Sequence, residues 1–160
     1  MSLVPEVVVL DYGSQFNLLI TRRLREHGVF SELIPPPERW DSAQFEGTRA
    51  VILSGGPQSV YDPESAKLPP GLLESGIPIL GICYGMQLLC QNLQGEVSRS
   101  NIREYGPAKL LTVTPHPLTE GVEIGQTCWM SHGDKVSKLP PHCHTLATTA
   151  DCDAIVYHTE

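Results

Sequence analysis

The sequence is short of basic residues, with 11 lysines and arginines against 18 aspartates and glutamates and a formal net charge of -7. Nucleic-acid binding normally requires a basic patch that neutralises phosphates, so this charge balance argues against a nucleic-acid partner. No apolar run approaches the roughly 20 residues that span a bilayer, and the N-terminus lacks the basic start and small-residue cleavage site of a signal peptide. We therefore expect a cytoplasmic protein without a membrane partner.

Cysteine is also sparse. The chain has five cysteines in no compact framework, namely Cys83, Cys90, Cys128, Cys143 and Cys152. A chain of 160 residues can bury a core without covalent cross-links, so we expect reduced thiols and one domain over residues 1–160. The group at 142–144 with Cys152 has the residue types of a zinc site. Adjacent strand residues point to opposite faces, however, and we expect no metal site there.

The first half of the chain alternates apolar runs with helical patterns. Buried strands are predicted from apolar runs at residues 7–10, 50–53 and 77–82, and a further strand at 29–34. Helices are predicted from an N-cap at Ser14 to the stop at Gly28, and from residue 84 to residue 93. Strands that alternate with helices indicate an α/β fold. We expect a flavodoxin-like, doubly wound, mostly parallel sheet with helices on both faces.

The second half of the chain, beyond Glu96, carries few helical signals. Short β-prone pieces lie at residues 109–114, 127–130, 145–149 and 154–157. Strand-like pieces without intervening helices are typical of antiparallel or edge strands. We expect the C-terminal half to add such strands to the same sheet.

A candidate nucleophile lies where a predicted buried strand turns into a helix, in the run Gly81-Ile82-Cys83-Tyr84-Gly85-Met86-Gln87. A sharp strand-to-helix turn crowds its neighbours, which explains the glycines two residues either side of Cys83. The helix N-terminus would favour the reactive thiolate. The alternative is a small buried apolar cysteine, and we prefer that interpretation for Cys90, which lies in a leucine-rich run.

Attack on a carbonyl requires donors for the oxygen that becomes negative, and two backbone amides commonly supply them. One would be the amide of Tyr84, directly after the nucleophile. The other would come from the glycine-rich run Ser54-Gly55-Gly56-Pro57, which follows a predicted parallel strand. A phosphate-binding loop is disfavoured because no Lys-Ser/Thr follows, whereas a plain structural turn stays open as an alternative.

These two runs resemble the nucleophile motif and the oxyanion strand of class I, triad-type glutamine amidotransferases. Three more segments resemble the GMP synthase branch of that family, namely Leu10-Asp11-Tyr12-Gly13-Ser14-Gln15, Arg103-Glu104-Tyr105-Gly106 and Trp129-Met130-Ser131-His132-Gly133-Asp134. Together the segments cover nearly the whole chain in family order. A cysteine hydrolase of a related elbow-bearing fold is disfavoured because it would not require the last two segments.

The resemblance implies that Cys83 attacks the side-chain amide of glutamine to form a thioester, with the oxyanion held by Gly56 and Tyr84. It implies that the amino-acid end of glutamine is bound by Gln87, Ser131, Gly133 and Asp134. The ammonia would pass to an ATP pyrophosphatase synthetase domain or subunit, which aminates adenylated XMP to give GMP. The resemblance implies no cofactor in this domain, with ATP and magnesium used by the synthetase.

The sequence departs from the family at the catalytic base. A cysteine nucleophile needs a base oriented by a carboxylate, and the His-Pro-Glu motif that supplies this pair in the family is not found before Glu160. His116-Pro117-Leu118 has leucine in place of the acid, and His132 lies in a binding segment. We therefore expect a truncated domain with poor or absent glutamine turnover. The alternatives are a glutaminase for another synthetase, or an inactive glutamine-binding module.

Overall fold

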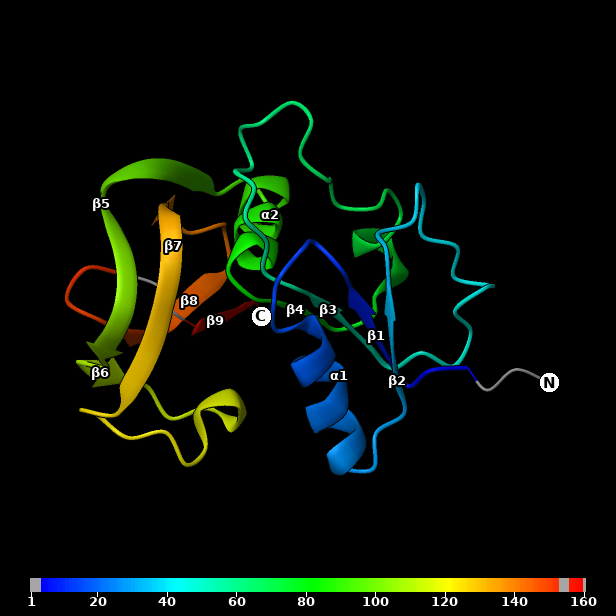
Figure 1. Ribbon diagram of the computed structural model, residues 1–160, viewed down its shortest axis with the longest axis horizontal. Coiled ribbons are helices and arrows are strands. Elements are labelled where there is room, and N and C mark those ends of the chain that lie inside the picture. The colour runs from blue at the N-terminus through cyan, green and yellow to red at the C-terminus, as the bar shows by residue number, and fades with distance from the viewer. Residues whose placement is uncertain (1–3, 153–155, 160) are drawn as a thin grey trace. The chain divides into compact units, whose positions relative to one another are not determined.

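The computed structural model describes residues 4–152 and 156–159, without the side chains of residues 100–105, 132 and 156–159. The chain forms two compact units, Met1–Leu89 and Cys90–Glu160 (Figure 1). Within the described ranges, no helix is long and apolar enough to cross a lipid bilayer.

The first unit is built on a four-stranded parallel sheet. Its strands are β1 (Val7–Leu10), β2 (Ser31–Ile34), β3 (Ala50–Leu53) and β4 (Ile79–Gly81), in the order β2-β1-β3-β4. Leu10 is paired with Leu53, and Leu53 with Gly81, so the carboxyl ends of β1, β3 and β4 are level. The loops after these strands therefore leave the sheet at one edge. Ligand sites of open parallel sheets form at this edge.

Helix α1, Asn17–Glu26, lies along one face of this sheet (Figure 1). Its residues Ile20 and Leu24 pack against a buried cluster. The cluster consists of Val7, Val9 and Ile52. Alternate strand residues point to the opposite face, and there Val8, Leu10, Val51 and Leu53 are fully buried. Both faces of β1 and β3 are therefore covered, which explains their continuous apolar sequences.

The predicted start of α1 is wrong. Ser14 does not cap the helix; its Oγ accepts a hydrogen bond from the backbone N–H of Phe16 at 3.1 Å, and α1 begins at Asn17. A turn held by Asp11 precedes the helix, because Asp11 Oδ1 accepts from Gly13 N at 2.8 Å and from Asn17 Nδ2 at 2.5 Å. The polar segment after β1 thus forms a closed turn before the helix starts.

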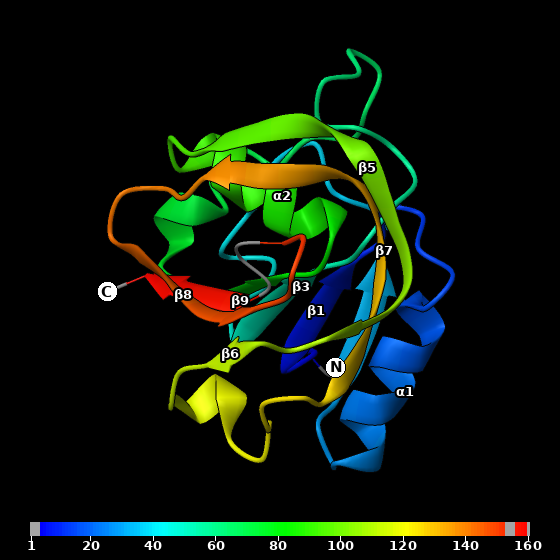
Figure 2. The same cartoon turned by 90° about the vertical axis from the view of Figure 1, so that its left-hand side faces the viewer.

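The second unit is antiparallel. Strand β5, Glu96–Lys109, pairs with β7, Thr127–Lys138, along a curved ribbon (Figure 2). A second sheet has the order β6-β8-β9, from Thr112–Val113, Cys143–Thr148 and Val156–Thr159. The antiparallel strands predicted for the C-terminal half are confirmed. Among the described residues they form two sheets of their own, however, so the prediction that they extend the parallel sheet is wrong.

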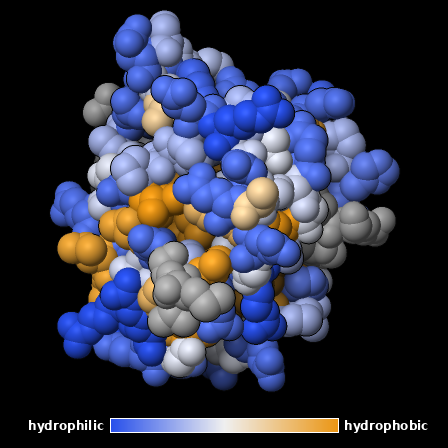
Figure 3. All heavy atoms as spheres, turned by 90° about the vertical axis from the view of Figure 1, so that its right-hand side faces the viewer, coloured by the Kyte–Doolittle hydropathy of each residue, from blue (hydrophilic) through white to orange (hydrophobic). Residues whose placement is uncertain are grey.

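Strand β2 is an edge strand of the parallel sheet, and the side of the first unit where it lies is not uniformly polar. Figure 3 shows hydrophobic residues in the middle of this side, with hydrophilic residues around them. Phe30, directly before β2, is 39 % exposed. The side chains inside the sheet are therefore less exposed to solvent than Phe30 at this edge.

Candidate active site

Cys83 occupies a strained turn between β4 and helix α2, Tyr84–Asn92. Its φ of +49° lies in the left-handed region, which non-glycine residues rarely adopt. Gln87 N donates to Cys83 O at 3.0 Å, and Gly85 N donates to Ile82 O at 3.0 Å and to Ser54 O at 3.1 Å. The thiol is half-buried and forms no disulfide. The turn has the strand-to-helix geometry that the sequence predicts, and strain of this kind is typical of functional positions. The role of Cys83 as nucleophile stays a prediction.

The glycines on either side of Cys83 leave room for close backbone packing. A Cβ atom on Gly81 would lie 2.6 Å from Met86 N, and one on Gly85 would lie 2.3 Å from Leu53 O. Real Cβ atoms essentially never approach this closely. The turn therefore requires glycine at both positions. The reason is backbone crowding, as the sequence pattern indicates.

The glycine-rich turn after β3 lies against the elbow. A Cβ on Gly55 would lie 3.4 Å from Cys83 Cβ, so the backbone of the turn passes directly beside Cys83. Ser54 is fully buried, accepts from Tyr12 N at 2.9 Å and donates to Gly55 O at 2.9 Å. Ser54 therefore connects the turn to the segment after β1. The first unit thus brings Cys83, Tyr84 and the turn that contains Gly56 to one place.

Burial affects the acidity of the Cys83 thiol. It raises the pKa of the Cys83 thiol above the ordinary cysteine value. The sequence predicts the opposite direction, because the N-terminus of α2 favours the thiolate. Burial removes part of the sulfur from water, which disfavours the charged form of the thiol. Cys83 therefore needs a proton acceptor before it can attack a carbonyl.

We expect the pH dependence of alkylation to show that the Cys83 thiol is less acidic than an ordinary cysteine, and that Cys90 is less acidic still. The thiolate is the reactive form, so a raised pKa lowers reactivity at neutral pH and moves the rise in rate to higher pH. Iodoacetamide should label Cys83 along a curve centred above about 8.5, the ordinary thiol value. Burial, followed by nearby Cys143 and Glu96, raises the pKa of Cys90 to about 11, so Cys90 should react later still. Peptide mass spectrometry across pH measures both curves, and a Cys83 midpoint below the ordinary value would contradict the expectation.

No histidine of the first unit is positioned as a base for Cys83. His27 is the one histidine among residues 1–89, and it lies at the C-cap of α1. The chain then enters β2, whose first residue Ser31 pairs with Val7, the first residue of β1. His27 is therefore near the amino ends of the strands, whereas Cys83 follows the carboxyl end of β4. Its interpretation as a helix-end residue agrees with this position.

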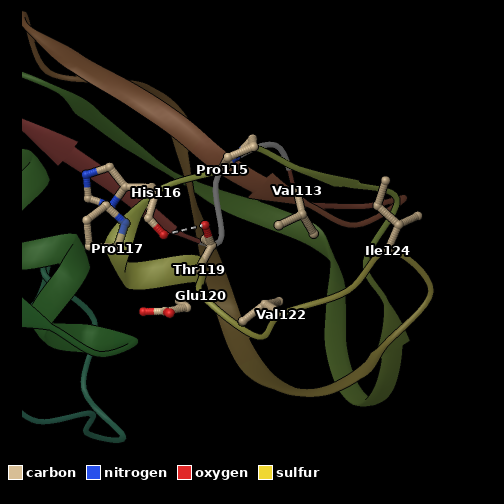
Figure 4. A pocket seen from close by; sticks show the side chains of 8 residues that line it. All are labelled: Val113, Pro115, His116, Pro117, Thr119, Glu120, Val122 and Ile124. Carbon is tan, nitrogen blue, oxygen red and sulfur yellow. Dashed lines mark hydrogen bonds between the residues drawn. The ribbon is translucent and has the colours of Figure 1, made fainter.

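His116 has a structural role in the second unit. It caps the short 3-10 helix Pro117–Thr119, where its Nδ1 accepts from Leu118 N at 3.2 Å and its carbonyl accepts from Thr119 Oγ1 at 3.0 Å (Figure 4). This turn lines an open, largely apolar pocket. The pocket is lined by Val113, Pro115, His116, Pro117, Thr119, Glu120, Val122 and Ile124. Its lining includes none of the residues predicted to act on glutamine.

The predicted glutamine-binding residues fall in both units. Gln87 lies on α2, is 5 % exposed and follows Cys83 by four residues, one helical turn. Ser131, Gly133 and Asp134 lie in β7 of the second unit. In the antiparallel register, the backbone of Asp134 lies opposite that of Arg99 in β5. The side chains of His132 and of the 103–105 run lie outside the described residues. The binding roles of these residues stay predictions.

Tyr12 contributes to the site in a way that its sequence position does not indicate. In the sequence it is only one member of a family segment, yet its ring packs against that of Tyr84, with centroids 5.4 Å apart. Its hydroxyl donates to Lys67 O, 55 residues away in the chain. Contacts over such sequence distances leave no local pattern, so only the structure identifies them.

Comparisons with known proteins agree with this geometry. The family model of class-I glutamine amidotransferases matches residues 8–159. A GMP synthase (glutamine-hydrolyzing) of Thermomicrobium roseum is 48 % identical over 145 residues, which is 91 % of this chain and 28 % of that protein. One from Enterococcus faecalis is 48 % identical over 149 residues, 93 % of this chain and 29 % of that protein. The chain thus spans less than a third of these curated relatives.

Solved structures share the fold. A putative GMP synthase subunit from Thermoplasma acidophilum has a TM-score of 0.78 at 24 % identity, covering 100 % of this chain and 80 % of that one. A glutamine amidotransferase from Thermotoga maritima has a TM-score of 0.79 at 20 % identity, covering 99 % and 73 %. The α/β fold class predicted from the sequence is confirmed. The chain belongs to the class-I glutamine amidotransferase family.

Proposed function

We propose that the chain is the glutaminase part of a cytoplasmic GMP synthase that hydrolyses glutamine. The observation that carries the proposal is the elbow at Cys83, with the turn after β3 beside it. Relatives named GMP synthase that are 48 % identical over most of the chain support the choice of this branch. ATP and magnesium would be used by the synthetase part of the enzyme, which aminates XMP, and this domain would hold no cofactor.

The reaction would begin with attack of Cys83 Sγ on the side-chain amide carbon of glutamine. A C–S bond forms, and the carbonyl oxygen becomes an oxyanion that accepts from the amides of Gly56 and Tyr84. The C–N bond then breaks and ammonia leaves with the proton that the thiol lost. Water hydrolyses the thioester to glutamate, and Cys83 regains its proton. Gln87, Ser131, Gly133 and Asp134 would hold the amino-acid end of glutamine throughout.

A second candidate is a module that binds glutamine without hydrolysing it. One observation favours it: burial raises the pKa of Cys83, and the first unit places no histidine beside that thiol. A chloromethyl ketone analogue of glutamine separates both candidates from a chain that does not bind glutamine. Its carbonyl takes the place of the amide carbonyl, and alkylation of the thiol releases chloride.

We expect the analogue to label the chain once, at Cys83, with saturation kinetics and with protection by glutamine. Cys83→Ser should abolish the labelling, and Cys90→Ser serves as a matched cysteine control that should retain it. Peptide mass spectrometry locates the label. Labelling that glutamine does not slow, or that spreads over all five cysteines, would reject both candidates. Glutamate release that Cys83→Ser abolishes then identifies the enzyme, whereas protection without release identifies the binding module.

A further inference from the structure

Two buried tyrosines pack against each other next to the two segments that are proposed to hold the oxyanion. Tyr12 follows β1, and Tyr84 is the first residue of α2, directly after Cys83. They are 4 % and 1 % exposed, and their rings are tilted by 51° with centroids 5.4 Å apart. A tilted pair at this separation is a favourable aromatic arrangement. The two side chains therefore form one packed, buried group.

Both hydroxyls end on neighbouring carbonyls of a single loop. Tyr84 Oη donates to Ala66 O at 2.5 Å, and Tyr12 Oη donates to Lys67 O at 3.2 Å. Burial raises the pKa of both phenols, so both remain protonated donors at neutral pH. The loop, residues 57–67, leaves β3 through Gly56. We refer to it as the oxyanion loop.

The oxyanion loop is braced by its own side chains. Ala66 N donates to Gln58 Oε1 at 3.1 Å, which joins the two ends of the loop. Lys67 Nζ donates to Asp62 O at 3.1 Å and to Ser65 Oγ at 2.9 Å, while Ser65 Oγ donates to Asp62 O at 2.7 Å. A displacement of Ala66 would therefore be passed to Gln58, two residues after Gly56.

We propose that Tyr84 is a positioning residue for the oxyanion hole, assisted by Tyr12. Its backbone amide is one candidate donor, and its hydroxyl holds, through Ala66 and Gln58, the loop that presents the other donor at Gly56. One residue thus fixes the distance between the two donors. This inference rests on the proposed function, because it concerns the same attack on a carbonyl. Two donors serve an oxyanion only when both reach the same oxygen atom.

Tyr84→Phe and Tyr12→Phe test the proposal because they remove one hydroxyl each and keep the rings. The probe is the chloromethyl ketone analogue of glutamine, with the maximal labelling rate and the half-saturating concentration measured separately. Iodoacetamide alkylates Cys83 by direct displacement at carbon without forming an oxyanion, and it reports on the thiol alone. Thr48→Val is the matched control. Thr48 also donates a buried hydroxyl to a backbone carbonyl, that of Pro5 at 3.0 Å, ahead of the first strand.

We expect Tyr84→Phe to lower the maximal labelling rate about tenfold, less than the roughly 100-fold or greater loss of a whole oxyanion donor. The half-saturating concentration and the iodoacetamide rate should not change, and Thr48→Val should leave all three unchanged. Tyr12→Phe should act in the same direction with a smaller effect, since its hydrogen bond is longer. The double variant should lose more than either single variant.

Two results would overturn the positioning role. One is a maximal labelling rate in Tyr84→Phe equal to that of the wild type. The other is an equal fall in the chloromethyl ketone and iodoacetamide rates, which would mean that the hydroxyl supports the elbow as a whole. If the wild type itself shows no saturable labelling, the proposed function fails and the positioning role falls with it. The wild-type curve therefore separates the two failures.

Discussion

Gly85→Ala should lower the free energy of unfolding by about 3 kcal/mol, from overpacking and a lost backbone hydrogen bond. The new methyl would lie 2.3 Å from Leu53 O and 2.6 Å from Leu53 Cβ. Leu53 cannot move away, because it is fully buried in β3 and its carbonyl accepts from Ile82 N at 2.9 Å. The strand or the first turn of α2 must shift instead.

A loss of this size is a large part of the roughly 5–15 kcal/mol that stabilises a typical domain. Urea unfolding followed by fluorescence measures it, with Gly133→Ala as the control. A Cβ on Gly133 would meet nothing within 4 Å, and its φ lies outside the left-handed region. The control should therefore unfold close to the wild type. An equal midpoint for Gly85→Ala would show that the elbow tolerates a side chain, contrary to the geometry of the site.

The sequence anticipates the elements whose pattern is local. The continuous apolar runs of β1 and β3 and the glycines around Cys83 each follow from a steric requirement within a few residues, and the structure has them where the sequence predicts them. The predicted start of α1 is misplaced because Ser14 forms a turn with Phe16 instead of a cap. Strand β5 is not predicted because polar residues, Gly106 and Pro107 interrupt its alternation.

The charge state of Cys83 shows a different limit. A motif indicates that a helix follows the nucleophile, and from that the helix terminus can be expected to lower the thiol pKa. The degree of burial depends on side chains distant in sequence, and it decides the direction of the pKa. The same holds for Tyr12, whose role depends on a carbonyl 55 residues away. Local sequence thus predicts the backbone geometry around Cys83 better than it predicts the pKa of the thiol.

Gly56→Ala is expected to reduce the reactivity of Cys83 toward carbonyl substrates more than any other single methyl added to the turn after β3. The new Cβ would lie 2.2 Å from Tyr12 O and 3.1 Å from Tyr12 C. Tyr12 is held at both ends, since its N–H donates to Ser54 Oγ at 2.9 Å and its hydroxyl donates to Lys67 O at 3.2 Å. The turn therefore has to move, and the proposed donor at Gly56 moves with it.

A displacement of about 1 Å in a reacting geometry can cost about 100-fold in rate, and we expect the maximal labelling rate by the chloromethyl ketone analogue to fall by that factor. The iodoacetamide rate of the same variant is the internal control and should change little, because direct displacement needs no oxyanion. Gly55→Ala tests whether the turn accepts a methyl at all. Its Cβ would make ordinary contacts, the nearest being Cys83 Cβ at 3.4 Å, so its thermal midpoint should stay near that of the wild type. Full reactivity of Gly56→Ala toward the analogue would remove Gly56 from the oxyanion hole.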